Sequence, residues 1–169
     1  QLSPEYVDPA YVGGARWLHV TGCNLAVAEG PRQACYRALN LVSSDTRVSF
    51  DPNIRPEVLT VEQVRALCAP AIARADVILP SLGEAAMLTG AACDEEGCRQ
   101  WAAQGKTVVL KQGPQGCRIF QGEVDLCVPG FAVEEVDPTG AGDCFCGGFT
   151  VATLEGLDLS LIHISEPTR

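Results

Sequence analysis

Residues 136–149 read Val-Asp-Pro-Thr-Gly-Ala-Gly-Asp-Cys-Phe-Cys-Gly-Gly-Phe, and this stretch contributes most to the prediction of the fold. The apolar segment 131–136 before it predicts a strand, and the residues after it predict a helix to about Leu154. Gly140-Ala141-Gly142 between a strand and a helix allows backbone N–H groups to approach an anion such as a phosphate oxygen. Asp143 falls in the first helical turn, where the helix dipole stabilises its carboxylate and where phosphoryl transfer would use it as a general base. The alternative interpretation is a tight turn with a capping aspartate, and Asp137 fits the role of a turn residue better than a catalytic one.

Upstream of this stretch, short apolar runs alternate with amphipathic segments, which is typical of βα units around a parallel sheet. Capping-box spacing at Thr60–Gln63 and at Ser81–Glu84 predicts two helix starts. The segments 117–120 and 124–128 are separated by only three residues and predict an antiparallel hairpin. The other expected elements are strands at 17–21, 47–50, 76–79 and 107–110, and helices at 31–42 and 94–104. The sequence therefore predicts an α/β fold with a mostly parallel sheet.

Composition excludes several functional classes. Twelve Lys and Arg against 21 Asp and Glu give the 169 residues a formal charge of −9, which disfavours a nucleic-acid partner. No apolar run approaches the roughly 20 residues of a membrane span, and the first residues lack the pattern of a signal peptide, so we expect a cytoplasmic protein with no membrane partner. The nine cysteines form no CxxC pair and the two histidines lie far apart, so we expect reduced thiols rather than a zinc site.

Polar loops follow the predicted strands, and parallel strands would bring these loops to one edge of the sheet. They are 51–55 (Asp-Pro-Asn-Ile-Arg), 81–84 (Ser-Leu-Gly-Glu), 111–116 (Lys-Gln-Gly-Pro-Gln-Gly) and 137–143. Each loop also has a structural interpretation. Asn53 is typical of turns, Glu84 has the third position of a capping box, and Gly113 and Gly116 are suited to a turn before the hairpin. The chain has neither the P-loop motif nor a GxGxxG after its first strand, so a P-loop enzyme is excluded and a Rossmann dehydrogenase is disfavoured.

The segment 136–149 closely resembles the C-terminal signature of the ribokinase-like (PfkB) carbohydrate kinases, D-x-T-G-A-G-D-x-F-x-G-G. Supporting matches are VSFDPNIRP at 48–56, ADVILPSLGEAAMLTG at 75–90 and VVLKQGPQG at 108–116, and the resemblance covers roughly residues 3–160. It implies a three-layer α/β/α sandwich that phosphorylates a small sugar or sugar acid with ATP and Mg²⁺. Among subfamilies the motifs are most similar to 2-keto-3-deoxygluconate kinases, with fructokinase and ribokinase-type specificities as alternatives.

The resemblance also implies roles for individual residues. Asp143 would deprotonate the sugar hydroxyl, and Gly140, Ala141 and Gly142 would form the anion hole. Glu84 would organise Mg²⁺ through water, although Ser81 stands where the family motif N-x-x-E has asparagine.

Further roles concern the two substrates. Arg55 would face a substrate carboxylate, with Asn53 in the same substrate-binding loop. The ATP side would be lined by residues of one loop, namely Lys111, Gly113, Gly116 and Cys117.

The resemblance does not include the N-terminal sugar-binding part of the family or its last helices. We therefore expect a kinase core at 1–160 that is truncated at both ends and is inactive by itself, or else a non-catalytic fragment that binds phosphate or nucleotide. The final residues 161–169 (LIHISEPTR) fit no element of the fold, so we expect them to be a non-native tail. The sequence does not decide whether the full-length enzyme forms a homo-oligomer.

Overall fold

The computed structural model describes residues 2–54, 59–134 and 136–157. Two short 3₁₀ turns, η1 (Pro4–Tyr6) and η2 (Gly113–Gln115), accompany the regular elements. The strands are β1 (Trp17–Thr21), β2 (Arg47–Asp51), β3 (Val77–Ile78), β4 (Thr107–Lys111), β5 (Cys117–Gln121) and β6 (Val124–Val128). The helices are α1 (Pro9–Gly13), α2 (Gly22–Val27), α3 (Glu29–Leu41), α4 (Val61–Arg74), α5 (Glu84–Thr89), α6 (Asp94–Ala102) and α7 (Ala141–Leu154).

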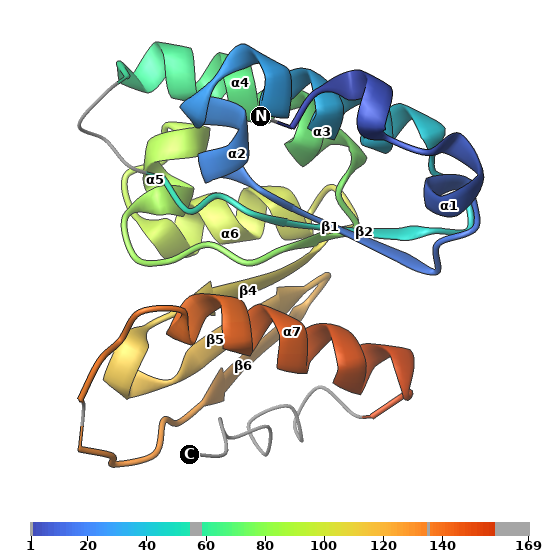
Figure 1. Ribbon diagram of the computed structural model, residues 1–169. Helices are drawn as coiled ribbons and strands as arrows, with labels where there is room; N and C mark the ends of the chain where they lie inside the picture. The colour runs from blue at the N-terminus through green and yellow to red at the C-terminus, as the bar shows by residue number, and fades with distance from the viewer. Residues whose placement is uncertain (1, 55–58, 135, 158–169) are drawn as a thin grey trace.

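The six strands form one sheet in the order of the chain (Figure 1). The first four strands are parallel, whereas β4–β5 and β5–β6 are antiparallel. The predicted mostly parallel sheet and its terminal hairpin are therefore confirmed. Because β1 to β4 run in the same direction, the residues at which they end, among them Thr21, Asp51 and Lys111, lie along one edge of the sheet.

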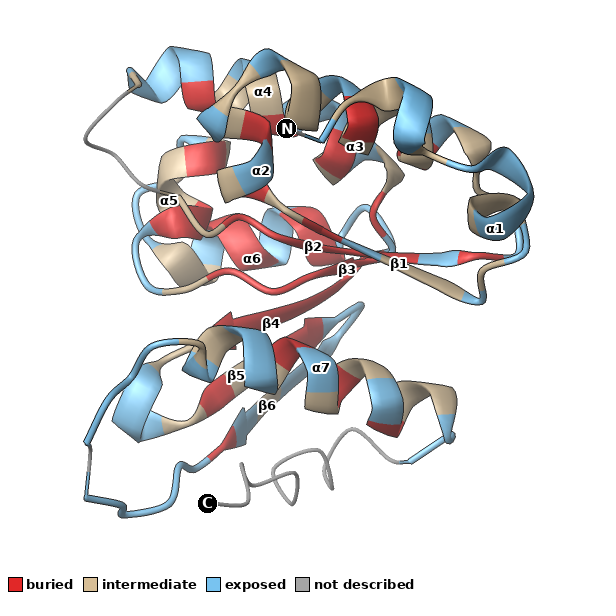
Figure 2. Ribbon diagram, viewed as in Figure 1, coloured by how far each residue is buried: buried red, intermediate tan, exposed pale blue. Residues whose placement is uncertain are grey.

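Alternation along the strands builds a core on each face of the sheet. Val48 and Phe50 of β2 point into the larger core, under helices α2 to α6, while Ser49 and Asp51 point to the opposite face. Among the described residues, helix α7 covers that opposite face (Figures 1 and 2). Its Phe149 and Cys146 are buried in one cluster with apolar residues of the sheet. These three layers confirm the α/β/α sandwich.

Two predicted strands differ from the structure, and some helices were not predicted. Residues 131–134 form no strand, and their side chains are exposed, because a run of this kind becomes a strand only when a neighbouring strand takes up its backbone hydrogen bonds. Strand β3 covers two residues rather than the four of 76–79. Helix α2 was not predicted, since it follows Thr21 directly with no turn residues between them. Among the described residues, no helix combines the length and the apolar character that crossing a membrane requires.

Candidate active site

A cleft opens at the edge of the sheet where the parallel strands end. Its lining comes from all four loops that the sequence places there: Asp51, Asn53, Ile54, Ser81, Leu82, Gly83, Glu84, Met87, Lys111, Pro138, Thr139, Gly140, Gly142 and Asp143. The common polar rim expected from the sequence is therefore present. Most of the lining is backbone and short polar side chains, which suits a strongly polar ligand better than an apolar one.

The first turn of α7 forms one wall of the cleft. Gly140 is the residue before the helix and has φ 80°, a conformation that glycine adopts without strain. The N–H of Ala141 donates to the Pro138 carbonyl (3.1 Å), and that of Cys144 donates to the Gly140 carbonyl (2.9 Å). Within the described part of the chain, the N–H groups of Gly142 and Asp143 have no acceptor. Two free donors at the positive end of a helix dipole are suited to an anion.

Asp143 lies beside these donors and is exposed, so its carboxylate is accessible to a ligand in the cleft. Ala141 is exposed as well but is not part of the lining. Asp137 has a different role, because its carboxylate accepts a hydrogen bond from the N–H of Thr139 (2.9 Å), and this bond lowers its pKa. The interpretation of Asp137 as a turn residue is confirmed.

An ion pair forms the floor of the cleft. The Nζ of Lys111 lies 2.6 Å from Oδ2 of Asp51, and their side chains are 12% and 2% exposed. The two residues end β4 and β2, and strand alternation directs both toward the α7 face. The Sγ of Cys146 in α7 also donates to Oδ2 of Asp51 (3.3 Å), and burial, its main perturbation, raises the pKa of the Cys146 thiol to about 12. This thiol therefore acts as a neutral donor at neutral pH.

Glu84 connects two of the loops. Its Oε1 accepts the N–H of Ile54 and its Oε2 accepts the N–H of Ser81, both at 2.7 Å. Burial raises the pKa of this carboxyl group, against the two hydrogen bonds, which lower it. The predicted capping box at Ser81 is wrong, because the residue before α5 is Gly83, whose backbone is left-handed and which supplies no side-chain cap. The bond from Ser81 to Glu84 nevertheless fixes the carboxylate in the cleft.

Whether Mg²⁺ fits this site depends on the available oxygen ligands. Within the described residues, no group of three His, Cys, Asp or Glu side chains is arranged to hold a metal ion. Mg²⁺ usually keeps several waters and takes one or two protein carboxylates together with substrate phosphates. Glu84 lines the cleft and each of its oxygens accepts a single backbone hydrogen bond, so it fits that kind of shared, water-mediated site.

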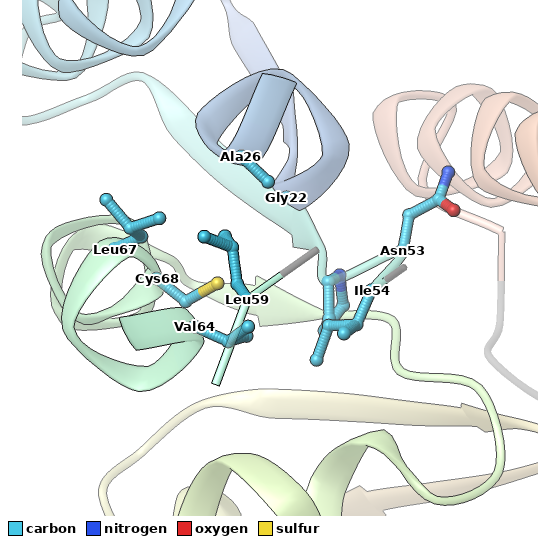
Figure 3. Close-up of a pocket in the computed structure, with 9 residues that line it drawn as sticks. Gly22, Ala26, Asn53, Ile54, Leu59, Val64, Leu67 and Cys68 are labelled. Atoms are coloured by element: carbon cyan, nitrogen blue, oxygen red, sulfur yellow. The ribbon is translucent and has the colours of Figure 1, made fainter. Parts of the chain in front are cut away.

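The loop after β2 carries the predicted substrate-binding residues. Asn53 has φ 38°, and its N–H donates to Oδ1 of Asp51 (3.2 Å). Beneath it, Ile54 contributes to a narrow apolar recess with Val64 and Cys68, and the amide of Asn53 points away from that recess (Figure 3). Asn53 therefore presents its polar group to the cleft. Arg55, the predicted carboxylate ligand, lies outside the described residues.

Of the predicted ATP-side residues, only Lys111 lines the cleft. Gly113 begins the short turn η2, and a Cβ there would meet open space. Gly116 packs against the backbone after β6, where a Cβ would lie 2.1 Å from the Val128 carbonyl oxygen, so packing accounts for this glycine. The side chain of Cys117 is buried in the smaller core, under α7. These three residues can reach a ligand only through their backbone.

A second polar group, formed by Trp17, His19 and Ser49, lies beside the cleft and was not predicted from the sequence. The indole N–H of Trp17 donates to the Ser49 hydroxyl (2.8 Å), and Nδ1 of His19 lies 2.7 Å from the same oxygen. Alternation in β1, which places Leu18 and Val20 in the larger core, was the available signal that Trp17 and His19 point to the α7 face. Nothing in the sequence indicated Ser49 as their partner, or Cys146 as a partner of Asp51.

Comparisons with known proteins agree with this geometry. A sequence profile described as "pfkB family carbohydrate kinase" matches residues 2–162. A fructokinase from Vibrio alginolyticus is 36% identical over 137 residues, which is 78% of this chain and 44% of the relative. A 2-dehydro-3-deoxygluconokinase from Thermoproteus tenax is 29% identical over 161 residues, which is 94% of this chain and 49% of the relative.

A solved structure is similar throughout. An E. coli protein assigned as a ribokinase II, in complex with ATP and Mg²⁺, superposes with a TM-score of 0.88 at 31% identity, covering 95% of this chain and 53% of that one. The chain thus spans about half the length of the relatives it matches. The profile match extends over nearly all of the sequence, and the fold and the glycine loop agree with it, so the chain belongs to the pfkB family of carbohydrate kinases.

Proposed function

We propose that this chain carries the phosphoryl-transfer centre of an ATP-dependent sugar kinase. The observation that supports this most strongly is the arrangement at the start of α7, where two unoccupied N–H donors lie beside the exposed carboxylate of Asp143. An anion site next to a carboxylate suits phosphoryl transfer, because the transferred group needs charge stabilisation and the acceptor hydroxyl needs a base.

In the proposed reaction, the Asp143 carboxylate accepts the proton of a sugar hydroxyl as the hydroxyl oxygen bonds to the γ-phosphorus of ATP. The bond between that phosphorus and the β,γ-bridging oxygen breaks, and ADP leaves with the bonding electron pair. The free backbone N–H groups of Gly142 and Asp143 would hold the phosphoryl oxygens, whereas the N–H of Ala141, which the resemblance also assigns to the anion hole, is engaged by the Pro138 carbonyl. A general base of this kind contributes roughly 10²–10⁴-fold to the rate.

The proposed positions of ATP and Mg²⁺ follow from the same cleft. ATP would run along the loop from Lys111 through Gly113 and Gly116 to Cys117, contacting the last three through their backbone. Glu84 would hold water molecules of a Mg²⁺ ion. When bound, that ion neutralises charge on the phosphates.

For the acceptor we propose a sugar acid, 2-keto-3-deoxygluconate. Arg55 supports this choice from the sequence, since a guanidinium can grip a carboxylate with two parallel hydrogen bonds and has no charge to pair with on a neutral sugar. Asn53 would contribute its amide to the same substrate. The similarity to a 2-dehydro-3-deoxygluconokinase supports it as well. Fructose is the second candidate, supported by the higher identity to a fructokinase.

The test measures ADP release with 2-keto-3-deoxygluconate, fructose and ribose, using the longest gene product that contains this chain. We expect the sugar acid to have the highest kcat/KM. Arg55→Ala should raise KM for the sugar acid much more than KM for ATP, and Arg55→Lys should restore it only in part. A preference for fructose that Arg55→Ala leaves unchanged would refute the sugar-acid assignment and leave the kinase assignment intact. ATP binding with no ADP release from any sugar would favour the non-catalytic alternative.

A further inference from the structure

The Asp51–Lys111 pair is more than a packed ion pair, because three elements contribute to it. Oδ1 of Asp51 accepts the N–H of Asn53 (3.2 Å), while Oδ2 accepts Lys111 (2.6 Å) and the thiol of Cys146 (3.3 Å). Both carboxylate oxygens are therefore engaged, and the carboxylate cannot rotate without losing bonds to β4, α7 and its own loop. The position of the Lys111 ammonium is fixed as a result.

That position is against the first turn of α7. Nζ of Lys111 lies 4.0 Å from Sγ of Cys146 and 3.7 Å from the point that a Cβ on Gly142 would occupy. The ammonium has three N–H donors, of which Asp51 accepts one and Sγ of Cys146 accepts another over the long distance of 4.0 Å. The Lys111 ammonium and the free N–H groups of Gly142 and Asp143 line the same cleft. An anion held by these N–H groups would therefore meet a cation as well.

Asp51 also determines what Lys111 can pair with. Lys111 and Asp143 both act electrostatically on the same two neighbours, Cys146 and His19. The titratable and charged groups around the ammonium are His19 of β1, Asp51 of β2, Glu84 of α5, and Asp143 and Cys146 of α7. Without Asp51, the exposed carboxylate of Asp143 would be an available counter-ion on the α7 wall, and pairing with a cation would make Asp143 a weaker base.

We propose that Lys111 stabilises the negative charge of the phosphoryl group during transfer, and that Asp51 is a positioning residue which holds the ammonium over Gly142 and away from Asp143. This inference rests on the proposed kinase function. It assigns Lys111 to the centre of the reaction rather than to the nucleotide side alone. Asp51, which itself contacts neither substrate, would act through Lys111.

Binding of inorganic pyrophosphate to the 169-residue chain tests this without any turnover. The measurement is a titration of the backbone ¹⁵N–¹H shifts of Gly140, Gly142 and Asp143. We expect Lys111→Met to weaken pyrophosphate binding by about tenfold, the usual effect of losing one charge-assisted hydrogen bond. Asp51→Asn should also weaken binding, although it removes a negative charge and would strengthen anion binding if only net charge mattered. Arg47→Gln, at the opposite end of β2, removes one positive charge and should leave binding unchanged.

A double variant keeps the test independent of folding defects. Asp51→Asn with Lys111→Met removes both buried charges together, so neither is left unpaired. If the two residues act as one unit, this double variant binds pyrophosphate no more weakly than Lys111→Met alone. Additive losses, or wild-type binding by Lys111→Met, would overturn the inference and leave the kinase proposal standing. Absence of pyrophosphate binding by the wild-type chain would count against the proposed function itself.

A pH profile separates positioning from general damage. In the active enzyme, Asp51→Asn should move the acid limb of kcat to lower pH, since Lys111 would then pair with Asp143, while KM for ATP changes little. A kcat profile with an unchanged acid limb would contradict the role of Asp51.

Discussion

Gly22 and Pro52 lie so close that a Cβ on Gly22 would be 1.9 Å from the carbonyl oxygen of Pro52. Gly22 begins α2 immediately after β1. Pro52 follows Asp51 and is the first residue of the loop that contains Asn53. The absence of a side chain at position 22 therefore allows the loop after β2 to adopt its position.

We expect Gly22→Ala to destabilise the fold, because backbone atoms rather than a flexible side chain occupy the space of the new methyl group. Overpacking of this kind typically costs about 1–3 kcal/mol. The measurement is the free energy of unfolding in urea. Gly147→Ala is the matched control, since a Cβ there meets nothing within 4 Å in the interior of α7, and this change should stabilise by roughly 0.5–1 kcal/mol. Equal stability of Gly22→Ala and wild type would contradict the close approach.

Replacement of Asp143, the proposed base, should lower the turnover rate and leave the stability of the fold unchanged. We expect Asp143→Asn to lower kcat by about 10²–10⁴-fold, as the loss of a general base usually does. Stability should stay close to wild type because Asp143 is exposed. The assay is ADP release in the longest gene product that contains this chain, with Asp45→Asn in the exposed loop before β2 as the control. Nearly normal turnover in Asp143→Asn would show that another group is the base.

His19 provides a prediction on pH. The Trp17 indole can only donate, so the Ser49 oxygen accepts from it, and Nδ1 of His19 is bonded to the same hydroxyl as donor or acceptor according to the imidazole tautomer. Partial loss of hydration, the largest cause, lowers the pKa of His19 below its usual 6.5, although the residue as a whole is exposed. The folded protein then binds fewer protons than the unfolded chain. The contribution of His19 to the stability of the fold is therefore fully present above about pH 6.5. It is lost as the pH falls through the pKa of His19 in the folded protein.

An NMR titration of the imidazole C–H signals checks this directly. We expect the His19 midpoint to lie below the ordinary 6.5. A wild-type midpoint at or above the ordinary value would be incompatible with the arrangement described.

The start of α4 offers a test of local stability. Thr60 Oγ1 accepts the N–H of Gln63 (3.3 Å), and Gln63 Oε1 accepts the N–H of Thr60 (2.9 Å), as the capping-box spacing predicts. Thr60→Ala should cost about 1 kcal/mol of unfolding free energy, within the usual range of 0.5–2 kcal/mol. Thr60→Ser keeps the hydroxyl and should retain most of the stability in urea unfolding. Indistinguishable values for the two variants would mean that the cap contributes nothing.

What the sequence allowed us to predict depends on how locally each feature is encoded. The glycine loop before α7, the Thr60 cap and the β5–β6 hairpin are determined by residues within a few positions of one another, and the structure contains all three. Parallel strand direction then brought the four loops to one edge, so the location of the cleft followed as well.

The remaining features arise from contacts between distant residues. Lys111 is 60 positions from Asp51, and Ile54 is 30 from Glu84, so no local pattern indicated either pair. The capping box expected at Ser81 is only half present: the Ser81 N–H donates to Glu84, but α5 begins after Gly83 and has no side-chain cap. The expected strand at 131–136 had a suitable pattern, but residues 131–134 remain exposed and do not join the sheet.

The bond from Cys146 to Asp51 spans 95 residues, the longest sequence separation among the contacts that build the cleft. Closing a long loop costs more chain entropy than pairing neighbouring strands, and strands β1 to β6 pair in sequence order. We therefore expect the sheet to gain protection from hydrogen exchange before α7 does during refolding. The turn at the start of α7 would then be completed last, so a partly folded chain would have its sheet but an incomplete cleft. Pulse-labelling exchange that protected α7 first would reverse this order.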